Sequence, residues 1–321
     1  MLPAELAALA AQRRYVTQVT ATNTWRLVDG LWRRVNRNDP AGSWDRTVAP
    51  TIGKLMRAAQ YAAASGAQQY VTAALDVQGV DPDSDGTVSP TAFVGTASDG
   101  NDLDGLLRVP AVGAQNAIDQ GAAADVALAE AGTRLKRIVD TQISDAARVP
   151  VGVAINAARH AEGYIRMLTP PSCARCVILA GKWYKSNAGF KRHPNCDCIH
   201  VPASEDYGRH YTTDPHAYFD SLIEDEQNRV FTKAGATAIR EHGADIFQVV
   251  NARRQMRWVQ MAGRQLRATQ IGVTKRSLAG QRLGAGKKRK VIRLTPESIY
   301  QIAGDNRTEL LRLLRLHGYI T

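Results

Sequence analysis

The stretch AAADVALAEAGTRLKRIVDTQIS, residues 122–144, shows the helical pattern that we expect over much of this 321-residue chain. Leu128, Leu135, Ile138 and Val139 recur at the spacing of one helix face, so the pattern predicts an amphipathic α-helix. The whole chain is rich in alanine and only 6% aromatic. Because alanine loses no side-chain entropy in a helix, this composition favours helix over sheet.

The same periodicity extends outward over the N-terminal half of the chain. Helical patterns cover residues 4–38, 43–75, 111–119 and 151–168. The sequence breaks at residues 38–42, and Pro50 and Gly53 are candidate positions for a kink or a division of the second helix. Residues 79–105 are loop-like and acidic. We therefore expect an α-helical docking domain over residues 1–170, and nothing in it resembles a catalytic site.

All four cysteines fall within residues 173–200, CARCVILAGKWYKSNAGFKRHPNCDCIH. Two close cysteine pairs suit tetrahedral zinc, because each pair places two thiolates on one metal while ordering few loop residues. The expected ligands are Cys173, Cys176, Cys196 and Cys198, with His193 as a further candidate. Short strands around VILAGKWYKS and CIHVPAS would complete a small zinc-ribbon-like β element that the metal stabilises.

Two other interpretations of the cysteines stay open. A redox Cys-x-x-Cys begins a helix that follows a strand, whereas this one follows a predicted helix and two prolines. The cysteines could also be unligated core residues, since a free cysteine packs as a small hydrophobic side chain.

Acidic residues also occur at metal-ligand spacing in residues 81–92, DPDSDGTVSPTA. Asp81, Asp83 and Asp85 occupy the first three ligand positions of a calcium loop, but Ala92 stands where a bidentate glutamate is needed. The sequence favours an acidic turn whose aspartates cap their own backbone.

The net charge of +11 is concentrated in one segment. Residues 251–294 contain thirteen Lys or Arg and no Asp or Glu, so subtracting them leaves −2 for the rest of the chain. Such a segment predicts a basic arm that binds a polyanion such as DNA, although a solvated basic segment is the simpler alternative. The candidate contacts are Arg253, Arg254, Arg257, Lys275, Arg276, Lys287, Lys288, Arg289, Lys290 and Arg293.

The remaining C-terminal sequence predicts short helices. Asp214 and Pro215 form a helix start, and two further helices meet at Gly243. A last helical pair should span residues 295–321.

The cysteine segment resembles the C-terminal module of MuF-like head-morphogenesis proteins of tailed phages. Residues 214–254 are similar to the version found in phages of actinobacteria, where such chains are called minor capsid proteins. The resemblance covers roughly residues 170–256. The matching positions are Cys173, Cys176, Leu179, Gly181, His193, Pro194, Asn195, Cys196, Cys198 and Pro202.

The resemblance implies a virion protein that lies inside the capsid near the portal and passes through the host cytoplasm during assembly. Its implied partners are the portal and major capsid proteins and the packaged DNA. The expected fold is mainly α: a helical domain (1–170), a MuF-like α+β module (171–250), a basic arm (251–294) and C-terminal helices (295–321).

Two other function classes remain as alternatives. Some phage chains of this type carry a capsid maturation protease, and a basic segment could also recruit a nuclease. We identify no Gly-x-Ser-x-Gly motif or defensible catalytic set, so a non-enzymatic role is expected. A free nucleic-acid-binding regulator would need the helix pair at Gly243 to read bases. No stretch approaches the roughly 18 apolar residues that span a bilayer.

Overall fold

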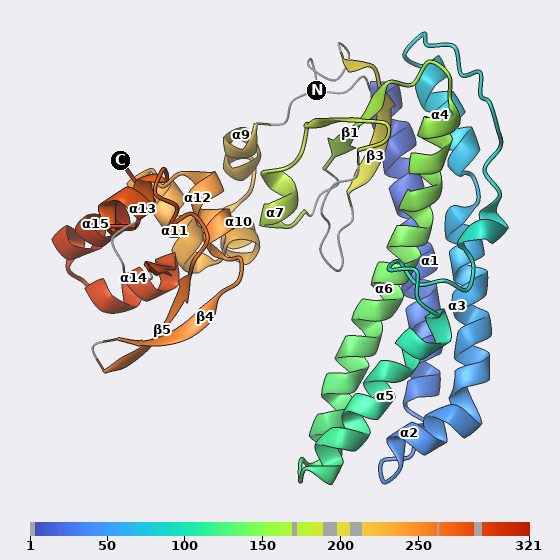
Figure 1. Ribbon diagram of the computed structural model, residues 1–321, viewed down its shortest axis with the longest axis horizontal. Coiled ribbons are helices and arrows are strands. Elements are labelled where there is room, and N and C mark those ends of the chain that lie inside the picture. The colour runs from blue at the N-terminus through green and yellow to red at the C-terminus, as the bar shows by residue number, and fades with distance from the viewer. Residues whose placement is uncertain (1–3, 169–171, 189–197, 206–213, 262, 286–290) are drawn as a thin grey trace. The chain divides into compact units, whose positions relative to one another are not determined.

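A computed structural model describes residues 4–168, 172–188, 198–205, 214–261, 263–285 and 291–321 (Figure 1). Helices dominate these residues, which confirms the mainly α class. The chain divides into two compact units. The first comprises Met1–Pro170 with Gly181–Thr212, and the second comprises Pro171–Ala180 with Thr213–Thr321.

Long helices of the first unit lie side by side and share one apolar core (Figure 1). Leu135 and Val139 are fully buried there, while Leu128 and Ile138 pack against the same core. The stripe predicted for residues 122–144 is therefore confirmed. The helices are α1 (Ala4–Trp32), α3 (Ala49–Ala64), α5 (Leu103–Asp119) and α6 (Ala124–Ala157).

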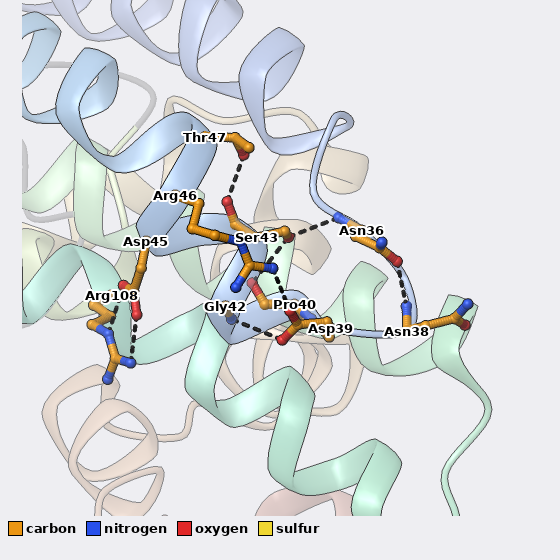
Figure 2. A network of polar contacts seen from close by, with 10 residues as sticks. All are labelled: Asn36, Asn38, Asp39, Pro40, Gly42, Ser43, Asp45, Arg46, Thr47 and Arg108. Atoms are coloured by element: carbon orange, nitrogen blue, oxygen red, sulfur yellow. Dashed lines mark hydrogen bonds and ion pairs between the residues drawn. The ribbon is translucent and has the colours of Figure 1, made fainter.

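The predicted break after the first helix is present and is held by polar contacts (Figure 2). The short helix α2 (Pro40–Ser43) is capped by Asp39, whose Oδ1 accepts a hydrogen bond from the Gly42 amide at 3.0 Å. The other carboxylate oxygen lies 2.6 Å from Nη2 of Arg46. A π-helical turn, η1 (Trp44–Val48), then leads into α3.

Proline does not divide the helices where the sequence suggested. Pro50 lies in the first turn of α3, where a missing N–H leaves no broken hydrogen bond. The division comes at Gly66, which has a φ of 74° and precedes α4 (Ala67–Asp76). Similarly, α6 passes through Pro150, so the separate patterns at 122–144 and 151–168 are one helix that ends at Ala157.

Residues 163–167, predicted as helix, form the central strand of a small antiparallel sheet. The order is β2-β1-β3, with β1 (Gly163–Met167) paired to both β2 (Trp183–Lys185) and β3 (Ile199–Ala203). Tyr164 stacks on Tyr184 and His200 at centroid distances of 5.4 and 4.2 Å. The helix prediction was wrong because pairing with two distant segments outweighs a weak local pattern.

The sheet is attached to the helices of the first unit through a second apolar core. Helix α4 and the C-terminal part of α6 pack against β3. The Tyr70 hydroxyl donates to the His200 carbonyl at 3.0 Å, and Nε of Arg148 donates to the Cys198 carbonyl at 3.0 Å. Both bonds satisfy backbone groups beside the strand.

The second unit combines short helices with its own sheet. As predicted, Asp214 caps a helix, α9, by accepting a hydrogen bond from the His216 amide at 2.8 Å. Gly243, with a φ of 62°, joins two further helices, which was also predicted. The helices are α7 (Ala174–Val177), α9 (Pro215–Asp220), α10 (Glu224–Phe231), α11 (Lys233–His242), α12 (Ile246–Ala252), α13 (Leu278–Arg282), α14 (Pro296–Ala303) and α15 (Arg307–Leu316).

The segment expected to be an arm is folded wherever it is described. Strands β4 (Arg257–Met261), β5 (Arg264–Thr269) and β6 (Arg293–Leu294) form an antiparallel sheet in the order β4-β5-β6. The hairpin turns at Gly263, which has a φ of 73°. In β5, buried Leu266 and Ala268 alternate with exposed positions, the pattern of a strand with one buried face.

Candidate metal segment and candidate nucleic-acid interface

The first cysteine pair forms a compact turn. Cys173 is the N-cap of α7, and its Sγ accepts a hydrogen bond from the Cys176 amide at 3.4 Å. The two Sγ atoms lie 3.4 Å apart. Two thiolates on tetrahedral zinc, each about 2.3 Å from the metal, would be separated by about 3.8 Å. The pair is therefore arranged closely enough to provide two ligands to one metal ion.

Of the other predicted zinc ligands, only Cys198 lies among the described residues. Cys198 is buried directly before β3 in the first unit. Cys196 and His193 lie outside the described residues. Among the residues that the structure does describe, no group of three or more His, Cys, Asp or Glu side chains could hold a metal ion. The four-ligand zinc site stays a prediction.

The acidic turn at residues 81–92 has a cationic partner within the protein. Nη1 of Arg159 lies 2.6 Å from Oδ2 of Asp83, and its Nε donates to Oδ1 of Asp85. Hydrogen bonding to Asp85, followed by the charges of both carboxylates, raises the pKa of Arg159. The turn is thereby tied to the end of α6, which agrees with its interpretation as an acidic turn.

A cavity of about 500 Å³ in the first unit is lined by four cations that sequence reasoning did not single out. Arg13 donates to the carbonyls of Ala63 and Ala147, at 2.6 and 3.0 Å. Nη1 of Arg148 lies 2.9 Å from Oδ1 of Asp145. Arg13 thereby connects α1 to α3 and α6, whereas the Arg148–Asp145 pair lies within α6. The four cations are Arg13, Arg14, Lys136 and Arg148.

The predicted DNA contacts of the second unit differ in their exposure. Arg257, at the start of β4, is exposed, as are Lys275 and Arg276 in the turn before α13. Arg253 and Arg254 are half-buried. Lys287, Lys288, Arg289 and Lys290 lie outside the described residues.

Arg293 does not fit a DNA contact, because its side chain is completely buried. Nε and Nη2 donate to the carbonyls of His317 and Gly318 at 2.6 and 3.1 Å, and Nη1 donates to Gln248 at 3.0 Å. The guanidinium also lies 4.1 Å from the ring centroid of Tyr319. Burial lowers the pKa of Arg293. This arginine holds the C-terminal end of the chain on the sheet.

The structure adds a tryptophan that sequence reasoning missed. Trp258 on β4 is directly opposite Arg267 on β5, and its side chain is 59% exposed. The guanidinium carbon of Arg267 lies 4.9 Å from the indole centroid. The alternating pattern around the Ala262-Gly263 pair in RWVQMAGRQLRAT could have indicated this hairpin.

Arginine side chains of the basic segment are held by hydrogen bonds to backbone carbonyls, which do not neutralise their charge. Arg264 donates to the Gln301 carbonyl at 2.7 Å, and Arg282 donates to the carbonyls of Arg315 and Ile320 at 2.6 and 2.9 Å. Within the described part of residues 251–294, no Lys or Arg forms an ion pair with a carboxylate. The segment therefore presents uncompensated positive charge on a folded scaffold, which suits a polyanionic ligand.

Over the described ranges, none of the helices has the length and apolar character required to cross a membrane.

Comparison with known proteins identifies a family to which most of the chain is similar. The family model described as VG15 protein matches residues 4–222, more than half of the chain. This range includes the first unit from Ala4 onward and stops before the basic segment. No curated protein and no solved structure matches the chain.

Proposed function

The chain belongs to the VG15 protein family, a family of phage and viral gene products, and from this premise we propose that it is a minor head protein of a tailed phage. In this proposal it lies inside the capsid near the portal and contacts packaged DNA. The family membership supports a phage protein. The place in the particle and the DNA contact are our proposal.

One observation carries the DNA contact: a folded segment that contains many cations and no acidic residue. Residues 251–294 contain thirteen Lys and Arg residues and no Asp or Glu. Arg257 is exposed on β4, which pairs with β5, and Lys275 and Arg276 are exposed in the turn that leads into α13. The backbone at all three positions is therefore part of the folded unit. Each phosphate contact made by such residues releases counterions, so binding should weaken steeply with salt.

The first unit would be the docking part. Helix α1 exposes Tyr15 at 67%, Val16 at 44% and Val19 at 38%. Tyr15 and Val19 are one helical turn apart and share a face. An exposed group of apolar side chains on a helix is a common feature of protein interfaces, and this supports a contact with the portal or the capsid wall.

A structural zinc ion remains part of the proposal. Cys173 and Cys176 would provide two thiolates, and Cys196 and Cys198, or His193 in place of one of them, would complete the site. Zinc in such a position adds folding free energy to a segment with little core of its own. The short separation of the Cys173 and Cys176 sulfur atoms supports this part of the proposal.

Quantitative mass spectrometry of purified phage particles tests the location. The chain should be present in a few copies per portal ring. Its absence from particles, together with abundance in the lysate, would contradict the virion assignment and favour an assembly factor or an enzyme.

DNA binding is tested separately on the purified chain. Replacing Lys287, Lys288, Arg289 and Lys290 with Glu should abolish binding to duplex DNA at low salt while the thermal unfolding midpoint is unchanged. Undiminished binding by this variant would rule out the stretch as a contact. Replacing Lys54 and Lys136 of the first unit with Glu is the control for a general effect of charge.

Elemental analysis tests the metal. The wild-type chain should bind one zinc ion, and C173S and C196S should each lose it, because removal of one thiolate weakens a four-ligand site strongly. A C196S variant that keeps one zinc per chain would show that the ligand set is wrong.

A further inference from the structure

The outer face of the β4–β5 hairpin carries an unusual set of side chains. Register places Trp258 opposite Arg267 and Gln260 opposite Gln265. Since side chains alternate across a strand, these four residues share one face. The opposite face contains the pair Val259 and Leu266, of which Leu266 is buried in the unit. All four residues of the outer face are exposed.

Exposure of Trp258 contrasts with tryptophans in the first unit. Trp32 and Trp44 are 7% and 2% exposed and pack against each other with centroids 6.0 Å apart. Trp258 keeps 59% of its surface exposed, and its ring contacts the Arg267 guanidinium. A cation–π contact of this kind holds the indole in a defined orientation without burying it.

We propose that this face binds the unpaired bases of single-stranded DNA, with a base stacked on Trp258. The inference rests on the DNA contact in the proposed function and specifies the form of the DNA. Exposed aromatic rings beside cations are the usual platform for single strands, because every base has a π-face and every nucleotide carries a phosphate.

The neighbouring residues fit this ligand. Arg267 lies on the same face as Trp258 and supplies positive charge for the backbone, and the sequence has no carboxylate between residues 251 and 294 to repel it. Gln260 and Gln265 offer amide donors and acceptors to base edges. In a duplex the bases are stacked on one another, so their faces are closed to an indole ring, and Trp258 should contribute little to duplex binding.

The experiment compares two DNA ligands on the full-length chain by fluorescence anisotropy. One is a labelled oligo(dT) of about 20 nucleotides, and the other is a duplex of similar length. W258A should weaken binding of oligo(dT) about tenfold and change duplex binding less than about twofold. W258F keeps a stacking ring and should retain most of the single-strand affinity.

A matched control separates stacking on this face from the loss of any exposed aromatic ring. Y61A removes a half-exposed ring from the first unit without touching the hairpin, and it should bind both ligands as the wild type does. Circular dichroism and the thermal midpoint show whether W258A folds. If W258A does not fold, the comparison of W258F with W258L decides the result, since a leucine side chain fills space without a ring.

The outcomes separate the two proposals. Equal single-strand affinity for wild-type, W258A and W258L chains, with duplex binding intact, would overturn the stacking site and leave the DNA contact standing. Equal losses for single strand and duplex in W258A would also overturn it, since that pattern indicates a phosphate surface or altered folding. No binding of either DNA by the wild-type chain would overturn both proposals.

Discussion

The first unit and the basic segment of residues 251–294 differ in the groups that contact their arginine side chains. In the first unit, several arginines pair with aspartates from other elements: Arg57 with Asp104, Arg108 with Asp45, and Arg159 with Asp83 and Asp85. In the described part of the basic segment, arginines donate to backbone carbonyls or stack on an aromatic ring. The first pattern neutralises charge internally, whereas the second fixes the side chains and leaves their charge for an external anion.

This difference shows why a count of basic residues is a poor guide to a binding surface. Arg293 and Arg257 belong to the same acid-free segment, yet one is completely buried and the other is exposed. Their mutations should therefore affect different properties, stability for the first and DNA binding for the second. Four predictions test the comparison, from the largest expected effect to the smallest.

The largest effect is expected from R293M. The substitution leaves the carbonyls of His317 and Gly318 and the side chain of Gln248 without their buried donor. The free energy of unfolding of the second unit should fall by about 3–5 kcal/mol, because three buried acceptors lose their donor at a cost of about 1–3 kcal/mol each. Denaturant unfolding, with hydrogen exchange as the probe of the second unit, measures this loss of unfolding free energy.

R257M is the control for this prediction, because the Arg257 side chain is exposed and the change should stay within about 0.5 kcal/mol. A loss in R257M as large as in R293M would show that the assigned difference in burial is wrong.

The next effect is a pH dependence caused by His317. Burial, followed by the charges of Arg293 and Arg312, lowers the pKa of this buried histidine to about 4. Its Nδ1 accepts a hydrogen bond from the Leu294 amide at 3.2 Å, which requires the unprotonated nitrogen. Between pH 6.5 and 4 the unfolded chain binds a proton that the folded chain does not, so stability falls as pH falls through this window.

The loss between pH 7 and pH 4 should be on the order of 3 kcal/mol for this group. H317N keeps an acceptor near Leu294 but cannot titrate, so its unfolding free energy should depend less on pH. Equal pH dependence in wild-type and H317N chains would exclude His317 as the cause.

A smaller effect should follow from neutralising exposed cations. The double variant K275Q/R276Q should weaken duplex binding about tenfold near physiological salt and lower the salt slope by about 2, since each lost phosphate contact removes about one released counterion. Stability should not change. Titrations of labelled duplex at several salt concentrations give both quantities.

R108Q in the first unit is the control for that binding test. A change in DNA affinity on R108Q, with none on K275Q/R276Q, would reverse the roles assigned to the two regions.

The smallest effect should come from the same R108Q variant when its stability is measured. Arg108 makes a bidentate contact with Asp45 at 2.8 and 2.7 Å (Figure 2), and hydrogen bonding to Arg108 lowers the pKa of Asp45. Both side chains are nearly half exposed, so the free energy of unfolding should fall by at most about 1 kcal/mol. A loss above about 3 kcal/mol would mean that surface pairs of the first unit are essential to its fold.

The sequence by itself determined the local features of this protein. The stripe through Leu135 and Val139, the cap at Asp214 and the joint at Gly243 were all predicted and are present. Each depends on residues within a few positions of one another, because helix periodicity, side-chain caps and left-handed turns act over short distances. The close Cys173 and Cys176 pair belongs to this class as well.

The tertiary structure decided the features that depend on distant partners. Residues 163–167 became a strand because residues 183–185 and 199–203 pair with them. Arg293 became a buried anchor because the end of the chain supplies carbonyls to it. Trp258 became an exposed ring because the other face of its hairpin packs inward. Burial, and the pairing of β1 with β2 and β3, are set by residues far apart in sequence, so no short-range pattern could have fixed these features.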